Sequence, residues 1–306
     1  MNNPRNHHYV SRFYLSGFTK SGGSKGKIYV FDKTRKKSFE TNPRNVASQR
    51  DFNRVEIKGN ENEVENALSG FEGITATAFK RIINNKQFPD EEDFSCLINF
   101  MCLLAIRNLR FRENFGDAKK RTYEQIMDIV VSNEDIYMSQ MKKLEKSTGE
   151  KYDLDYHAMK SFIDEKRYTI EIPSHSFVYT ELSVFDKVLP SFFKRNWTML
   201  ISNSKVGEFV TSDHPITLIS ASESKAIALG FRHKNTEVAF PISRYLAIVG
   251  RYETGLPATL KATPRLVADI NGRTINYSKS QIYSSDKNYY FMDFDGEIKN
   301  SSVIIN

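Results

Sequence analysis

The sequence predicts an α+β fold: a helical cluster of three or more long helices packed on a mostly antiparallel sheet, preceded by an N-terminal helix and hairpin. Between residues 60 and 146, apolar side chains recur every three or four positions, which is the spacing of one helix face. After residue 151 they fall into short alternating runs separated by turn residues, which is typical of antiparallel strands. A chain of 306 residues with 40% hydrophobic side chains can bury a sizeable core.

The first element is expected to be a short helix within the stretch NHHYVSRFYL. Asn6 can cap this helix and Gly17 can end it. On such a helix His8 and Arg12 share one face, because they are four residues apart. The opposite face would pack into the body of the protein through Val10, Phe13 and Tyr14.

A hairpin and three long helices are expected next. Residues 28–31 and 38–40 alternate as two strands joined by the turn DKTRKK. The helical spacing covers residues 61–83, 94–111 and 118–150. The second of these helices is apolar nearly all round, which predicts that it is the central buried helix.

The second half of the chain is expected to form the sheet, with one helix over residues 263–285. The strand-like runs are residues 168–172, 177–182, 197–202, 207–212, 216–220, 225–231, 236–242, 245–250, 289–294 and 297–305. The polar stretch at residues 148–155 is the expected boundary between halves. We therefore expect regions 1–60, 61–150 and 151–306, which together form one composite domain with a cleft between its halves.

The charge is concentrated at the N-terminus. Residues 1–60 carry 13 Lys and Arg against four acids, a balance of +9, so a net charge of +7 leaves −2 for the rest. A basic lobe on a near-neutral body is typical of a protein that meets phosphates, and Lys36 and Lys37 in the hairpin turn are candidate contacts. The alternative is a solvated basic surface that serves solubility.

Several protein classes are disfavoured by what the chain lacks. No apolar run approaches the roughly 18 residues of a membrane span, and the first residues carry no secretory segment. Cys96 and Cys102 are the only cysteines, which argues against a disulfide framework and predicts a cytoplasmic protein with no membrane partner. The phosphate loop, the dinucleotide glycine motif and the serine-hydrolase elbow are all missing.

Two short polar motifs contain the candidate catalytic and metal-binding residues. His7 and His8 are adjacent, so on a helix they cannot point along one direction, and they can equally be the solvated end of a packing helix. In the stretch SDHP, Pro215 favours an extended or turn conformation at His214, and Asp213 could be a metal ligand, a general base or the orienter of a histidine. The alternative for Asp213 is an Asx-turn that caps its own backbone.

Arginines and an amide add candidate binding groups. Arg107 and Arg110 end the apolar helix and could hold a carboxylate or phosphate, or pair with acids such as Glu72. We expect Arg107 to be buried and Arg112 to be exposed. Asn271 sits in an apolar helical face, where a buried amide must either tie the helix to the sheet or bind a ligand.

Taken in order, several stretches are similar to a bacterial family catalogued as domain of unknown function 4238. They are HHYVSRFYLSGFT, KIYVFDK, NVASQRDFN, TSDHP, FPIS and the Asn271 helix ending in QIYSS, and they extend from about residue 7 to 285. Members often have proline where Ser11 stands and asparagine where His214 stands. The resemblance marks His7, His8, Arg12, Asp213, Pro215 and Asn271 as family-defining positions without assigning them roles, and implies a loose association with mobile elements and phage defence.

Three functions are consistent with these features. The first is an enzyme acting on nucleic acid, most simply a metal-dependent nuclease in which His8, Asp213 and His214 hold Mg²⁺ or Mn²⁺, with His7 beside the catalytic pair. A base-excising or nucleotide-modifying enzyme would use much the same parts. Arg12, Arg107, Arg110, Lys36, Lys37 and Asn271 would contact substrate.

The second function is a non-catalytic nucleic-acid-binding module that uses the basic lobe and exposed aromatics such as Tyr29 and Phe31. The third is a regulatory component of a toxin or defence system that binds another protein through its sheet. The enzyme hypothesis makes a geometric prediction: the side chains of His8 and Asp213 lie within about 3 Å of each other, directly or across one water or ion.

Overall fold

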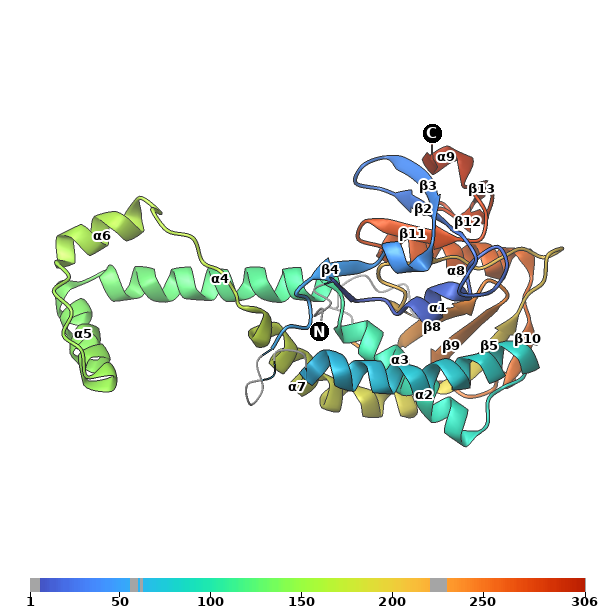
Figure 1. Ribbon diagram of the computed structural model, residues 1–306, viewed down its shortest axis with the longest axis horizontal. Helices are drawn as coiled ribbons and strands as arrows, with labels where there is room; N and C mark the ends of the chain where they lie inside the picture. The colour runs from blue at the N-terminus through green and yellow to red at the C-terminus, as the bar shows by residue number, and fades with distance from the viewer. Residues whose placement is uncertain (1–5, 56–59, 61–62, 221–229, 306) are drawn as a thin grey trace. The chain divides into compact units, whose positions relative to one another are not determined.

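The computed structural model describes residues 6–55, 60, 63–220 and 230–305, and it divides the chain into two compact units. The main unit contains residues 1–111 and 178–306, and the second unit contains Arg112–Phe177. Figure 1 labels the elements of both. The expected boundary at residues 148–155 therefore lies inside the second unit. The fold is α+β, with helices packed on mostly antiparallel sheets, as the sequence predicts.

A five-stranded sheet forms the centre of the main unit. Its strands are ordered β10 (Thr259–Lys261), β5 (Asn196–Ile201), β9 (Leu246–Arg251), β8 (Thr236–Ser243) and β7 (Thr217–Ser220), and only the pairing of β10 with β5 is parallel. All eight residues of β8 are buried, as expected of a strand whose sheet is covered on both faces.

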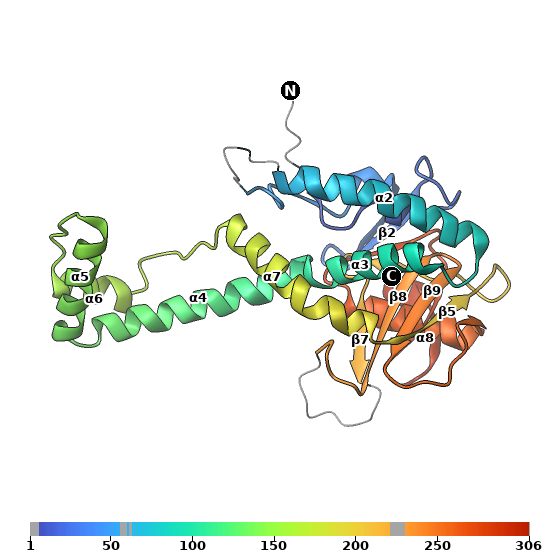
Figure 2. The ribbon, with the colours of Figure 1, turned by 90° about the horizontal axis from the view of Figure 1, so that it is seen from below.

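Helices cover both faces of this sheet (Figure 2). One face packs through Phe240 and Ile248 against α1 (Arg12–Ser16), α2 (Glu63–Asn85), α3 (Glu91–Ile106) and the main-unit part of α7 (Ser174–Phe193). The other face packs through small residues such as Ala239 and Ala247 against α8 (Pro264–Tyr277). The predicted central helix is α3, nine of whose 16 residues are buried.

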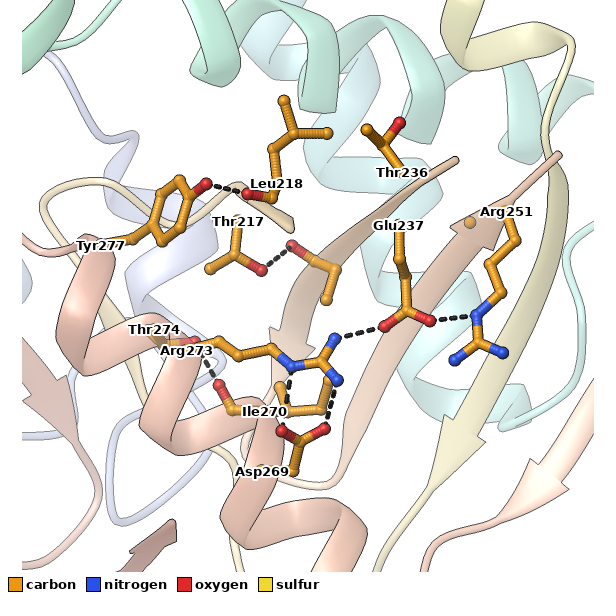
Figure 3. A network of polar contacts seen from close by, with 12 residues as sticks. Thr217, Leu218, Thr236, Glu237, Arg251, Asp269, Ile270, Arg273, Thr274 and Tyr277 are labelled. Atoms are coloured by element: carbon orange, nitrogen blue, oxygen red, sulfur yellow. Dashed lines mark hydrogen bonds and ion pairs between the residues drawn. The ribbon is translucent and has the colours of Figure 1, made fainter. Parts of the chain in front are cut away.

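A buried ionic network fixes α8 on the sheet (Figure 3). Glu237 of β8 is 3% exposed and pairs with Arg251 of β9 and with Arg273 of α8. Arg273 also pairs with Asp269 one helical turn away at 2.5 Å. Because a buried carboxylate is costly unless it is paired, these two arginines hold the register between α8 and the strands.

A second sheet lies beside the first in the main unit. Its order is β3 (Lys37–Thr41), β2 (Ile28–Asp32), β11 (Gln281–Ser284) and β6 (Thr211–Ser212). The predicted N-terminal hairpin is confirmed, with Ile28 opposite Thr41. Shorter elements complete the unit: β1 (Asn6–His8) paired with β4 (Ser48–Arg50), β12 (Tyr290–Met292) paired with β13 (Ile298–Asn300), the 3₁₀ turn η1 (Pro43–Asn45) and α9 (Ser302–Ile305).

The second unit is helical. It consists of α4 (Leu109–Val131) from Arg112 onward, α5 (Glu134–Thr148), α6 (Tyr156–Asp164) and the first residues of α7. Its own small core contains Val131, Tyr137 and Ile163. The single helix expected over residues 118–150 is broken, because Asn133 caps a new helix by accepting from the backbone N–H groups of Asp135 and Ile136.

Several expected strands are wrong. Residues 168–172 have no regular structure, and residues 177–182 lie in α7, where a helical register also accommodates alternating apolar residues. In the run 207–212 only Thr211–Ser212 is a strand. The late helix ends at Tyr277, because Ser278 is extended and the chain then turns into β11. The run 225–231 falls largely outside the described residues.

Among the described residues, no single helix is long and apolar enough to cross a membrane. Only α3 and α4 taken together, across the break at Arg107 and Asn108, pass that test by length and composition. Most of the α3 apolar residues belong to the buried core of the main unit.

Candidate active site at the histidine motif

The histidine pair lies on a strand, and the expected helix begins four residues later. His7 and His8 belong to β1, opposite Gln49 and Ser48 of β4. Side chains alternate along a strand, so His7 points inward and is 1% exposed, whereas His8 is only partly buried. Helix α1 begins at Arg12. An isolated short helix is marginal, and pairing with β4 gives the backbone around the histidines a better set of hydrogen bonds.

The apolar face of the motif packs as the sequence predicts. Val10 and Tyr14 are each 1% exposed, and Phe13 contacts the rings of Phe79 and Phe100. The Tyr14 hydroxyl lies 2.6 Å from the hydroxyl of Thr211, so the motif does meet the strand that precedes Asp213.

A buried polar chain connects His7 to helix α2. The backbone N–H of Asn53 donates to Nδ1 of His7 at 2.9 Å. The Asn53 amide donates to Glu65 Oε2 at 2.5 Å, and its oxygen accepts from Nε of Arg107 at 3.1 Å. His7 is therefore a buried residue that stabilises the fold through its hydrogen bond. Asn53 connects β1, α2 and the end of α3 through its hydrogen bonds.

Arg107 is 5% exposed, so its predicted burial is confirmed. Its Nη2 donates to the carbonyl oxygen of His8 at 2.7 Å, and its guanidinium lies 5.5 Å from the ring centre of Phe52. Its charge also acts on Glu72. The expectation that Arg112 is exposed is wrong, because Arg112 is 9% exposed and packs over Phe177 in the second unit.

Glu72 and His8 carry perturbed proton affinities. Burial raises the pKa of Glu72, against the opposing effects of a 2.5 Å hydrogen bond from Ser11 and of the charges of Arg107 and Arg12. Burial, followed by the charge of Arg12, lowers the pKa of His8. His8 is therefore neutral at pH 7, and its Nε2 lies 3.3 Å from the carbonyl oxygen of Arg44.

A cavity of about 570 Å³ opens beside Glu72, and Arg44, whose carbonyl oxygen lies near His8 Nε2, also lines it. Glu72 and Phe13 lie in its wall, together with hydroxyl and amide side chains at Ser16, Ser24, Asn42 and Ser69. Arg12, Lys25 and Arg44 supply three exposed cations to its rim, and within the described part of the chain none of the three forms an ion pair. Unpaired cations around a polar hollow favour an anionic ligand.

Asp213 is placed differently from the expectation. It is 1% exposed, and its carboxylate accepts from the backbone N–H groups of Lys279, Ser280 and Gln281 at 2.6–2.9 Å and from the Ser280 hydroxyl at 2.6 Å. The prediction was a contact between His8 and Asp213, either directly or across one water or ion, and among the described residues the two side chains form no direct hydrogen bond. The charge of Asp213 instead acts on the neighbouring Tyr9, whose pKa burial and that charge both raise.

Two other candidate residues near Asp213, the family-defining Asn271 and the predicted metal ligand His214, make structural contacts. The Asn271 amide donates to the carbonyl oxygens of Glu208 and Tyr290, and its oxygen accepts from the Val210 N–H, so Asn271 ties α8 to its neighbours. His214 packs its edge against Tyr277. Burial and the charge of Arg110 lower the pKa of His214 to about 4.

The remaining predicted contacts are dispersed. Lys36 and Lys37 are exposed at the hairpin turn, and Arg110 is exposed beside Tyr277. Phe31, expected to be an exposed aromatic, is 6% exposed and belongs to a core cluster. Over the described ranges, no three His, Cys, Asp or Glu side chains come together in a way that could hold a metal ion.

Sequence reasoning missed several residues of this site. Asn53, Glu65, Lys25 and Arg44 were not singled out, and Glu72 was considered only as a partner for Arg107. One signal was available: Glu65 and Glu72 are seven residues apart, which puts both carboxylates on one face of the predicted helix. Nothing in the sequence showed that this face would meet the histidine motif.

The family model described as "Protein of unknown function (DUF4238)" matches residues 6–288. The chain belongs to this family. No curated protein matches the chain, and no solved structure does. The DUF4238 match includes the histidine strand, the α2 carboxylates, Arg107 and the Asp213 turn, so the cavity and its supports all lie within the family region.

Proposed function

We propose that the protein is an enzyme that acts on nucleic acid, as a hydrolase of the phosphodiester backbone, and that the cavity at the histidine motif is its active site. The observation that carries this proposal is the combination in the cavity wall: Arg12, Lys25 and Arg44 without ion pairs among the described residues, beside the Glu72 carboxyl group with its raised pKa. The His8 imidazole, whose pKa is lowered, lies next to this wall through its contact with the carbonyl oxygen of Arg44. Perturbed titratable groups in a hollow are a common mark of active sites.

The charge of the cavity rim fits a phosphate-bearing polymer. The three cations that form no ion pair within the described ranges belong to the N-terminal region, whose balance is +9 while the remaining residues sum to −2. Such a field attracts a polyanion over a distance comparable to the Debye length and weakens as salt rises. A neutral substrate would leave these cations without a role.

The two titratable groups fit acid–base chemistry. Neutral His8 can accept a proton from an attacking hydroxyl or water, and the raised pKa of Glu72 increases its protonated fraction, so that it can deliver a proton to the leaving oxygen. Arg12, next to both, is placed to balance charge that develops on the phosphate. The sequence led us to expect a divalent metal ion, but the cavity wall contains one carboxylate and three cations, which do not fit a metal site, so no step is assigned to a metal.

The test is cleavage of labelled single-stranded and duplex DNA and RNA, with Mg²⁺, Mn²⁺ or a chelator. We expect Glu72→Gln and His8→Ala each to lower cleavage by at least about 10²-fold. Glu91→Gln is the matched control, because Glu91 is exposed in the first turn of the neighbouring helix α3 and its side chain forms no hydrogen bond or ion pair among the described residues. Full activity in both site variants, with normal folding, would refute this active site.

The second candidate is a non-catalytic nucleic-acid-binding module, favoured by the same cations. It predicts that Arg12→Ala weakens binding while no substrate is cleaved under any of those conditions. A role in cytoplasmic phage defence is a further part of the proposal. Its test is the plating efficiency of phages on cells that express the wild type or Glu72→Gln.

A further inference from the structure

A second cationic feature lies outside the cavity, at Arg110. This arginine is exposed near the start of α4, and its guanidinium carbon is 5.6 Å from the ring centre of Tyr277. Among the described residues, its guanidinium forms neither a hydrogen bond nor an ion pair. None of the residues that line the 570 Å³ cavity belongs to this group.

The Tyr277 ring, over which the Arg110 guanidinium lies, is held in place by the fold. The Tyr277 hydroxyl donates to the carbonyl oxygen of Leu218 on β7 (Figure 3). The His214 ring packs edge-on against the Tyr277 ring, with 5.7 Å between centres. An arginine on a fixed aromatic face loses less freedom on binding, and its N–H edge stays directed away from the ring.

A second positive charge reinforces this position. Lys33 lies close enough that the charge of Arg110 lowers its pKa, although burial is the larger cause. Its Nζ donates to the carbonyl oxygens of Ile275 and Ser278 at the end of α8. Lys33 is therefore a cation with a fixed position. The Asp213 carboxylate, whose charge acts on Lys33 more strongly than that of Arg110, offsets part of its charge.

His214 adds an unsatisfied polar atom. Its Nδ1 is buried and has no hydrogen-bond partner, whereas most buried polar atoms in folded proteins have one. An unpaired guanidinium, a fixed cation and a buried unpaired nitrogen occur around one tyrosine.

We propose that Arg110, held on Tyr277 and reinforced by Lys33, is a second phosphate-binding site for the nucleic acid whose scissile bond occupies the cavity. A planar guanidinium suits bidentate binding of a phosphate. A phosphate bound at Arg110 would place negative charge beside Arg110 and Lys33 and so offset the repulsion between these two cations. The identity of the polymer rests on the proposed function, whereas the phosphate chemistry rests on these residues alone.

The first experiment compares variants in oligonucleotide binding, measured by fluorescence anisotropy across a salt series. We expect Arg110→Ala to weaken binding about fivefold to tenfold and to reduce the salt slope by about 0.7–0.9, the contribution of one phosphate contact. Arg110→Lys should lie between, because an ammonium keeps the charge without the planar fork. Arg121→Ala is the control, since Arg121 is exposed on the same helix and has no partner among the described residues.

The second experiment reads the site directly by NMR. The His214 imidazole signal, assigned with His214→Asn, should move when inorganic phosphate is added to the wild type and should stay in place in Arg110→Ala. If Arg110→Ala binds the oligonucleotide like Arg121→Ala, the inference is wrong, even if phosphate alone moves the signal, because the site would then serve only a small anion.

These results are independent of the cleavage test. Loss of affinity in Arg110→Ala, with full cleavage by Glu72→Gln and His8→Ala, would support this site and refute the proposed active site. The reverse pattern would refute this site alone. A wild-type protein that binds no nucleic acid at all would overturn both.

Discussion

Two carboxylates of the main unit, Asp213 and Glu72, are both shielded from water, but they differ in the number of hydrogen bonds that they accept. Asp213 is 1% exposed and accepts hydrogen bonds from four donors, three of them backbone N–H groups. Glu72 is partly exposed in the wall of a cavity and, among the described residues, accepts one side-chain hydrogen bond, from Ser11. Sequence reasoning favoured Asp213 for chemistry, whereas the active site proposed above uses Glu72.

The difference shows what leaves a buried carboxyl group available for proton transfer. The donors around Asp213 use up its lone pairs and close the loop between α8 and β11 against the end of β6, so its charge serves the fold. At Glu72 burial outweighs the favourable groups, and the pKa rises. A carboxyl group with a raised pKa keeps its proton to a higher pH than an ordinary glutamate, which favours the role of a general acid.

The largest expected effect is on stability, from Asp213→Ala. The substitution leaves three backbone N–H groups and one hydroxyl without their acceptor, and we expect a loss of about 3–5 kcal/mol in the free energy of unfolding. Denaturant titration measures it. Asp295→Ala is the control, because Asp295 is exposed in a turn, and it should cost less than about 0.5 kcal/mol. A variant of normal stability that has lost activity would instead restore Asp213 as a candidate catalytic group.

Arg107→Ala should have the next largest effect, about 2–4 kcal/mol in the free energy of unfolding. It leaves the Asn53 side-chain oxygen and the His8 carbonyl oxygen without this donor, in a region where Arg107 itself is 5% exposed. Arg121→Ala, which removes the same charge from an exposed helical position, should stay within about 0.5 kcal/mol. Equal stabilities of the two variants would show that Arg107 does not hold the histidine strand.

The sequence predicted an element correctly where the residue pattern within that element determines its structure, and it failed where the structure depends on a distant part of the chain. The hairpin at β2 and β3 and the buried helix α3 follow from alternation and apolar spacing, which are read within one element. The strand at His7 and His8 depends on pairing with β4, more than 40 residues away along the chain in the register His7 to Gln49. Tertiary pairing overrode the local helical pattern there.

The candidate site was predictable only in part, for the same reason. His8 and Arg12 come from one motif and were identified together. Glu72 joins them only because α2 packs beside α1, which residue spacing does not encode. Asp213 illustrates the same limit: the sequence identified its polar turn as a candidate site, but it could not show that the carboxylate accepts hydrogen bonds from a loop more than 60 residues later in the chain.

Glu72→Gln should change how the free energy of unfolding depends on pH. The size of this change should be smaller than the losses expected for Asp213→Ala and Arg107→Ala. Because the folded-state pKa lies above its ordinary value of 4.5, the folded protein binds more protons than the unfolded chain between those values. Stability is therefore lost as pH rises through that window, and the penalty persists above it. The glutamine variant, which cannot ionise, should gain melting temperature relative to wild type as pH rises from 4.5 to 7. A constant difference across that range would show that burial does not disfavour the Glu72 charge.

His8→Gln should produce the smallest change, with the opposite pH dependence. Burial and the charge of Arg12 put the folded-state pKa of His8 below its ordinary value of 6.5, so the unfolded chain binds the proton first as pH falls. Wild type should therefore lose stability as pH drops from 7 through that window, while the variant lacks this contribution. The measurement is the melting temperature of both proteins at pH 5 and pH 7. If the variant loses as much as wild type, the imidazole is not held neutral, and His8 could not be the base that accepts a proton at the phosphate.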